Sequence, residues 1–259
     1  MGAVTRKIGT SSRLRPMLGT FVAVEVEIGE GADASTAIEA AYCAIERVDR
    51  LMHPTRAGSD LERLATAPLG TATQVHPWTH AVLELARELN RQSAGAFDPC
   101  LPVAPGRMRD VLLADAGVTC GARVAIDLGG IAKGFAVDRA VEALIDHGAL
   151  AGMVNAGGDL RVFGIEARSI ELRTPAGALR VELRDAALAV SARRGAGSPP
   201  EHRGYYHGSS GAQVDGSFVA VSAPSAAAAD ALCKCAMLCE PGLLGRLLES
   251  HGARLIYGT

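Results

Sequence analysis

Apolar and polar positions alternate along residues 22–28, where valine or isoleucine fills every second position. That period of two predicts a half-buried strand. From about Ser35 apolar residues recur instead at spacings of three and four, until His53 and Pro54 interrupt the pattern, and this predicts a helix. Its apolar face consists of Ile38, Tyr42, Ile45, Val48 and Met52.

The rest of the chain changes from helical to extended patterns. A helix is predicted over residues 77–93, with Pro77 at its first turn, and another follows Gly134. The apolar face of this later helix consists of Phe135, Ala136, Ala140, Val141, Leu144 and Ile145. Short strands are predicted over 152–155, 160–163, 169–173, 179–183, 187–191, 217–222 and 254–257, and closing helices over 225–239 and 242–251. We expect an α+β fold with mixed or antiparallel sheets and packed helices, in one domain over residues 1–259.

A glycine-rich junction lies between a short apolar run, residues 124–128, which we interpret as a strand, and the helix after Gly134. We call residues 127–131 the glycine loop. Glycine lets the backbone approach a ligand closely, and the first turn of a helix offers N–H groups to anions. Lys133 adds a mobile positive charge at this turn, and Asp127 adds a carboxylate just before it. The junction therefore predicts a cradle for a phosphorylated ligand.

Composition narrows the class of protein. With 259 residues, of which 48% are hydrophobic, the chain can bury a sizeable core. A net charge of −2 gives no support for a nucleic-acid partner. No run approaches the roughly 18 apolar residues that span a membrane, and residues 1–16 are basic and polar, without the apolar region of a signal peptide. We therefore expect a cytoplasmic protein without a membrane segment, unless the given start lacks a native leader.

The six cysteines fit that compartment as free thiols, because none forms a Cys-x-x-Cys pair. Three of them, Cys233, Cys235 and Cys239, fall on one predicted helix. Cys235 and Cys239 share a helix face, which is also the arrangement of a soft-metal site. We favour small buried thiols in a packed helix and assign these cysteines no metal.

The sequence from Asp127 to Gly134, Asp-Leu-Gly-Gly-Ile-Ala-Lys-Gly, resembles the signature of the FAD:protein FMN transferases, the ApbE family. Other segments resemble that family in the same order along the chain. They are Met17-Leu-Gly-Thr20, Gly95-Ala-Phe-Asp-Pro99, Asn155-Ala-Gly-Gly-Asp159, Ala189-Val-Ser-Ala192 and Ala229-Asp-Ala-Leu232. The resemblance extends from about Arg15 to Tyr257 and so covers nearly the full length.

This resemblance implies an activity. Family members bind FAD, coordinate Mg²⁺ on its diphosphate and pass the FMN half to a Thr or Ser hydroxyl of an acceptor protein, while AMP leaves. A magnesium ion suits such a step because it neutralises the phosphates, whereas the protein mainly positions the partners. We therefore expect a flavin transferase whose partners are FAD and an acceptor protein.

The same resemblance implies which residues form the site. The FAD-binding residues would be Leu18 (at the family's Met position), Thr55, Ala96, Phe97, Asp98, Asp127 and Lys133. Asp98 with Pro99 is equally consistent with a simple turn, and for Asp127 a turn-forming carboxylate is the alternative to the binding role that we favour. Thr55 stands near the family's aromatic position over the isoalloxazine ring, so we expect that stacking contact to be absent.

The metal site implied by the resemblance departs from the family pattern. It would consist of the Gly130 carbonyl, Asp230 and the residue four positions later, which is Thr in the family and Lys234 here. Residues four apart lie on one helix face. A unit charge about 4 Å from a divalent ion costs on the order of 8 kcal/mol at an effective dielectric of about 20. Lys234 therefore has two alternatives. Its side chain turns away from Asp230, for example to face solvent, or its ammonium replaces part of the ion's positive charge by pairing with Asp230 or with the diphosphate.

His207 is the second departure, because the family follows this His closely with Asp-Pro and here Gly208 comes next. We take His207, as a general base toward the acceptor hydroxyl, and Asp230 as the candidate catalytic residues. A surface histidine is the alternative for His207. Two other functions stay open: a non-catalytic FAD-binding protein, and an FAD pyrophosphatase that yields FMN and AMP.

Overall fold

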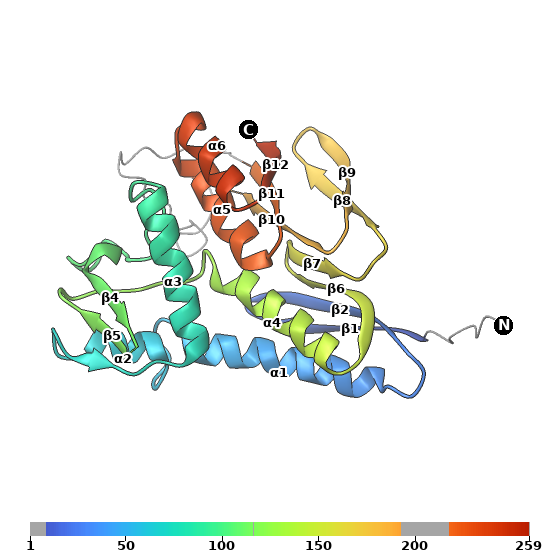
Figure 1. Ribbon diagram of the computed structural model, residues 1–259, viewed down its shortest axis with the longest axis horizontal. Coiled ribbons are helices and arrows are strands. Elements are labelled where there is room, and N and C mark those ends of the chain that lie inside the picture. Colours follow the sequence, from blue (N-terminus) through green and yellow to red (C-terminus); the bar gives the residue numbers. More distant parts are fainter. Residues whose placement is uncertain (1–8, 116, 193–217, 259) are drawn as a thin grey trace.

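A computed structural model describes residues 9–115, 117–192 and 218–258 (Figure 1). Its described residues build a seven-stranded sheet in the order β1-β2-β6-β7-β10-β11-β12, in which neighbouring strands are antiparallel. These strands are β1 (Gly9–Met17), β2 (Thr20–Ile28), β6 (Ala149–Ala156), β7 (Asp159–Phe163), β10 (Ala186–Ala192), β11 (Phe218–Ala223) and β12 (Arg254–Gly258). Strands β8 (Arg168–Thr174) and β9 (Gly177–Leu183) form a separate hairpin. A small three-stranded sheet has the order β3 (Ala72–Thr73), β5 (Gly117–Cys120) and β4 (Val111–Ala114).

Helices cover one face of the large sheet. The α-helices in the described part of the chain are α1 (Ala34–Met52), α2 (Asp60–Thr66), α3 (Pro77–Gln92), α4 (Ala132–Asp146), α5 (Ala226–Leu238) and α6 (Pro241–Ser250). Helix α4 packs against both α1 and α5, and against strands β6 and β7 (Figure 1). Among the described residues, no helix combines the length and apolar character needed to cross a bilayer.

The large sheet is buried on both faces in its central part, because successive side chains of a strand point to opposite sides. On β10, Ala187 and Ala189 join the core cluster that contains the buried faces of α1, α4 and α5. Leu188, between them, joins a second cluster with Leu172 of β8 and Leu183 of β9. The sheet therefore lies between the helices and the β8–β9 hairpin.

The predicted helices and strands are present, and α1 illustrates why. Asp33 caps the helix, since its carboxylate accepts the N–H groups of Ser35 and Thr36 at 3.0 and 3.1 Å. The buried face includes all the residues that the spacing predicted: Ile38, Tyr42, Ile45, Val48 and Met52. The helix ends before Pro54, as expected. The α+β class is confirmed, with antiparallel pairing throughout the described large sheet.

Some expectations differ from the structure. The apolar run at 124–128 forms no regular strand, and its Ile126 makes only an isolated bridge to Cys100. Ile145 was expected on the buried face of α4 but is 49% exposed. Strand β1, helix α2 and the small sheet were not predicted, because β1 is polar and largely exposed and the others span only two to seven residues.

The six cysteines are all free thiols. Cys233 and Cys235 are buried on α5, whereas Cys239 at its end is partly exposed. Burial raises the pKa of the Cys233 thiol to about 12. Cys233 is therefore a neutral packing residue at physiological pH, in keeping with the favoured interpretation.

Candidate functional site

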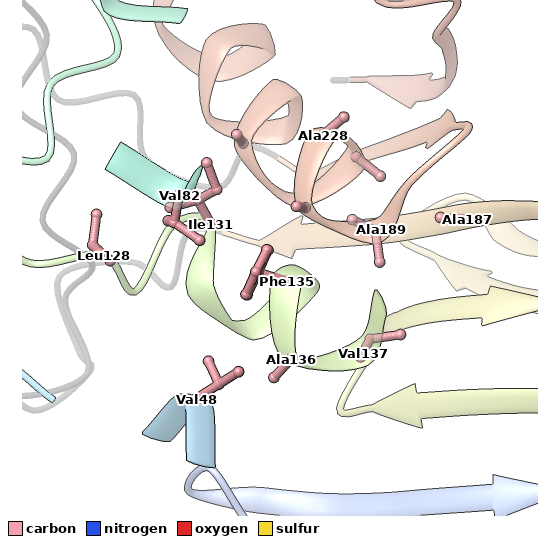
Figure 2. Close-up of a cluster of buried hydrophobic side chains, with 14 of the residues drawn as sticks. Val48, Val82, Leu128, Ile131, Phe135, Ala136, Val137, Ala187, Ala189 and Ala228 are labelled. Carbon is pink, nitrogen blue, oxygen red and sulfur yellow. The ribbon is translucent and has the colours of Figure 1, made fainter. Parts of the chain in front are cut away.

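The glycine loop enters α4 with apolar anchors on both sides. Leu128 and Ile131 are 1% and 0% exposed, and Figure 2 shows both in a cluster that also contains Val48 of α1. Gly129 lies between these anchors, and its N–H donates to the carboxylate of Asp127 at 2.8 Å. Packing from the core thus holds the loop in place, while Gly129 stays at the surface.

A cavity of about 490 Å³ lies beside the glycine loop. Three parts of the chain form its wall: the β1–β2 turn, the end of α1 with the residues that follow it, and the glycine loop with the start of α4. The lining residues are Leu18, Gly19, Val48, Asp49, Met52, His53, Pro54, Arg56, Asp127, Gly129, Ala132 and Lys133. The structure therefore brings together three of the predicted FAD-binding residues, Leu18, Asp127 and Lys133.

Leu18 lines this cavity in an unusual backbone conformation. Its φ is 53° and that of Gly19 is 69°, so both turn residues lie in the left-handed region. Such a turn suits the twist of the β1–β2 hairpin, but a leucine there is strained. The tight turn places an apolar side chain, partly buried against the core, at the edge of the cavity.

Lys133 is held by an ion pair, in contrast to the mobile charge that the sequence suggested. Its Nζ contacts Oδ2 of Asp159, which is 0% exposed. The other oxygen of Asp159 has no hydrogen-bond partner among the described residues. Burial lowers the pKa of Lys133 below its ordinary value, with Asp230 opposing the shift and Lys234 adding to it. The two glycine motifs are thus joined by a pair of opposite charges at the cavity.

The turn between β6 and β7, which belongs to the second glycine motif (residues 155–159), also packs against the β1–β2 turn. Gly157 has a φ of 66°, and a Cβ there would lie 2.4 Å from Oγ1 of Thr20. Asn155 closes the turn by accepting the N–H of Gly158 at 3.0 Å. The segments around residues 20, 130 and 157 therefore pack together, although they lie far apart in the sequence.

Asp230 and Lys234 form a second buried ion pair where α5 meets the start of α4. The Lys234 Nζ donates to Oδ1 of Asp230 and, at 2.8 Å, to Oγ of Ser191. Oδ2 of Asp230 accepts the N–H of Gly134 at 3.2 Å. Although burial opposes ionisation, Lys234 and Lys133 hold the pKa of Asp230 below its ordinary value. The carboxylate is therefore charged, and its charge is balanced by lysine.

Helices α4 and α5 meet with almost no space between them. A Cβ on Gly134 would lie 2.1 Å from the carbonyl oxygen of Ala226. One turn further along α4, the carboxylate of Asp138 accepts the N–H groups of Ala226 and Ala227, each at 2.9 Å. It also pairs with Arg161 of β7 at 2.9 Å. Asp138 thus fixes the start of the helix that carries Asp230 and Lys234.

The ApbE family model matches residues 18–105 and 106–256, nearly the whole chain. The chain belongs to the ApbE family. A curated relative, the FAD:protein FMN transferase of Treponema pallidum (strain Nichols), is 25% identical over 188 residues. That match covers 60% of this chain and 52% of the relative, so the chain matches about half the length of the relative.

Solved ApbE structures share the fold described above. The apo flavinyl transferase ApbE of Pseudomonas stutzeri has a TM-score of 0.80 at 19% identity, and the match covers 98% of this chain and 92% of that one. For the flavin transferase ApbE of Vibrio cholerae the TM-score is 0.81 at 20% identity, with coverage of 96% and 93%. The ApbE protein of Thermotoga maritima gives 0.79 at 23%, with coverage of 95% and 93%. At these identities the likeness establishes the ApbE fold.

Several predicted site residues of this ApbE chain do not line the cavity. Asp98 serves as a turn former, because its Oδ1 accepts the N–H of Cys100 at 2.9 Å. Phe97 is buried, and its ring lies 3.8 Å from where a Cβ of Gly130 would stand. Ala96 is partly buried and Thr55 is exposed. The candidates Gly130, Asp230 and Lys234 do not line the cavity either, and His207 lies outside the described residues.

Sequence reasoning missed three contributors to the site. Asp138 carries no local signal, and Asp159 ends a segment that resembles the family, but only the tertiary structure shows what each carboxylate contacts. Ser191 belongs to a segment that resembles the family, yet its hydroxyl was not recognised as a partner of Lys234. A buried polar side chain implies a partner, but the sequence does not say which residue supplies it.

The residues present do not fit a divalent cation at the site that the ApbE family implies. Mg²⁺ prefers oxygen ligands, whereas the ammonium of Lys234 has no lone pair. The carboxylate of Asp230 is already engaged by Lys234 and by the Gly134 N–H. Within the described ranges, no three His, Cys, Asp or Glu side chains form a group that could hold a metal. We therefore assign no step of the reaction to a metal ion.

Proposed function

We propose that this ApbE-family protein transfers the FMN moiety of FAD to a Thr or Ser hydroxyl of an acceptor protein, with release of AMP. Membership of the family and the similarity to the Treponema pallidum FAD:protein FMN transferase support this proposal. The observation that carries it is the cavity beside the glycine loop, with Asp127 and Lys133 in its wall. A positively charged group in the wall of a cavity suits a phosphorylated ligand.

The proposed reaction is a phosphoryl transfer. The acceptor hydroxyl oxygen attacks the phosphorus of the FMN half, and the bond from that phosphorus to the bridging oxygen breaks. AMP leaves with the bridging oxygen, while the hydroxyl loses its proton. Catalysis of this class depends mainly on positioning and on stabilising negative charge. In this chain Lys133 supplies positive charge beside the cavity, and the turn formed by Asp127 shapes the glycine loop.

The test uses the purified protein, FAD and a protein extract from cells that lack this gene. A transferase yields AMP together with flavin fluorescence that stays on a protein band in a denaturing gel. An FAD pyrophosphatase yields AMP and free FMN without any labelled protein, and a non-catalytic FAD-binding protein yields neither. The last two outcomes would each refute the proposed transfer.

A matched pair of variants connects the activity to the cavity. Asp127→Asn retains an oxygen that can accept the Gly129 N–H, whereas Asp127→Ala removes both this acceptor and the charge. We expect the Ala variant to lose more labelling than the Asn variant, because it also loses the turn. Equal labelling by both variants and the parent would remove the glycine loop from the proposed site.

A further inference from the structure

The ammonium of Lys234 is a fixed cation beside the glycine loop. It lies between Asp230 and Ser191, and Lys234 is only 8% exposed. Its stem packs on the loop, since a Cβ of Gly130 would stand 3.5 Å from both Cγ and Cε of Lys234. The lysine therefore does not turn away from Asp230, and the second alternative from the sequence describes its position.

The choice of lysine at this position is unusual for the chain. Only three of its 26 basic residues are lysines, namely Lys7, Lys133 and Lys234. Two of the three form ion pairs with fully buried carboxylates around the start of α4, Lys133 with Asp159 and Lys234 with Asp230. Lysine carries a compact point charge, whereas arginine spreads its charge over a planar fork. The ammonium of lysine is therefore closer in size and shape to a metal ion than the guanidinium of arginine is.

The balance of charge around the start of α4 has a consequence for metal binding. Each of the two buried carboxylates, Asp159 and Asp230, already faces one ammonium group. A divalent ion is attracted where oxygen ligands carry uncompensated negative charge. Here it would meet a neutralised carboxylate and the repulsion of Lys234. The two ion pairs together carry no net charge, but their ammonium groups are hydrogen-bond donors, which suit the oxygens of an anionic ligand and not a cation.

We infer that the Lys234 ammonium replaces a divalent cation, so that this protein binds the diphosphate of FAD without a metal ion. The inference rests on the proposed function and deepens it by naming what neutralises the diphosphate. Ser191 and Asp230 are then positioning residues for the ammonium. Both hold Nζ on the side of α5 that faces the start of α4.

The first test needs no variant. FAD is titrated into the metal-free parent protein in EDTA and, separately, in excess Mg²⁺, and binding is followed by the quenching of flavin fluorescence. We expect the same affinity in both buffers. A loss of about tenfold or more in EDTA, as expected when a charge-assisted contact to the diphosphate disappears, would overturn the inference.

Two variants of position 234 sharpen the test. Lys234→Thr offers a hydroxyl instead of a charge, so we expect FAD to bind weakly in EDTA and to regain affinity with Mg²⁺. Lys234→Met keeps much of the length without charge or oxygen, and we expect weak binding that Mg²⁺ does not restore. Thermal unfolding of each variant shows whether it is folded. A folded Thr variant that matches the parent in both buffers contradicts the role of Lys234.

Failure of the inference is distinguishable from failure of the proposed function. FAD binding in EDTA, with no flavin-labelled acceptor in the gel assay, would refute the transfer and leave the inference standing. FAD binding and labelling that both require Mg²⁺ would refute the inference and leave the transfer standing. If FAD bound in neither buffer, both the inference and the proposed function would be refuted.

Discussion

Gly134 is the residue at which α4 and α5 touch. In Gly134→Ala the new Cβ would stand 2.1 Å from the carbonyl oxygen of Ala226, so α5 must move and Asp230 loses its contact with the residue 134 N–H. We expect a loss of about 1–3 kcal/mol in the free energy of unfolding, as for other overpacked sites, together with weaker FAD binding. Denaturant unfolding and FAD titration measure the two effects.

The same substitution elsewhere provides the control. Gly245 lies within α6, is exposed, and a Cβ there would meet no atom within 4 Å. Gly245→Ala should therefore raise stability by about 0.5–1 kcal/mol, because alanine has less backbone freedom to lose on folding. If Gly134→Ala were equally stabilising, the close approach of the two helices would be wrong.

Lys133 combines a role in binding with a role in folding. Lys133→Met removes the positive charge at the cavity and leaves Asp159 buried without its cation. We expect FAD to bind about tenfold more weakly, with a smaller dependence of affinity on salt because a charge–phosphate attraction is lost. FAD titrations at several salt concentrations measure this effect. Lys133→Arg retains the charge and should keep most of the salt dependence; unchanged affinity in Lys133→Met would exclude the residue from the site.

Part of the site could be predicted residue by residue. Asp127 and Lys133 stand next to glycines at a helix start, where short-range chemistry already suggests a ligand, and both line the cavity. Asp98 could not be assigned, because a turn-forming and a binding carboxylate have the same local sequence. The hydrogen bond from Lys234 to Ser191 exists because α5 packs on β10, and the spacing of residues along the chain does not reveal that packing.

At the scale of elements, Asp138 of α4 adds to the capping of α5, whose N-cap residue Ser225 accepts the N–H of Ala228. Asp138 accepts the N–H groups of Ala226 and Ala227 and pairs with Arg161, while being 4% exposed. Asp138→Ala should cost about 3–5 kcal/mol of unfolding free energy, because the arginine is left uncompensated and the helix start loses its acceptor. Denaturant unfolding at neutral pH measures the loss.

The control is Asp146, an exposed residue at the other end of the same helix. Asp146→Ala should change stability by no more than about 0.5 kcal/mol, as is usual for surface substitutions. A small effect of Asp138→Ala as well would show that α5 does not depend on the carboxylate of α4.

Elements with strong amphipathic patterns were predictable, and short or polar elements were not. Helix α1 buries residues at helical spacing over 19 positions, so its pattern identifies it. Strand β1 is stabilised differently: Arg13 and Arg15 pair with Glu39 of α1 at 2.8 and 2.5 Å. Such contacts follow from the tertiary structure and leave no alternation of apolar residues in the sequence.

At the scale of the whole molecule, His76 joins α2 to the start of α3 and lies against α1. Its Nδ1 accepts the N–H of Trp78 at the start of α3, at 3.1 Å. Its backbone N–H donates to Asp60 of α2 at 2.9 Å, and Nε2 lies 2.8 Å from the guanidinium of Arg47 on α1. These contacts help to hold α2 and α3, which pack against the small sheet, to α1. Helix α1 in turn packs against α4 of the large sheet's helical layer.

Stability should therefore fall as the pH drops toward 5. Burial and the nearby Arg47 lower the pKa of His76 below its ordinary 6.5, with Asp60 opposing the shift. Between that folded pKa and 6.5 the unfolded chain binds more protons than the folded one, so acid favours unfolding there. A protonated Nδ1 would also lose its ability to accept the Trp78 N–H.

His76→Asn retains a capping oxygen that does not titrate, and we expect its midpoint of thermal unfolding to depend less on pH than that of the parent. Equal dependence from about pH 5 to 7, the range in which histidines titrate, would show that other groups control acid stability.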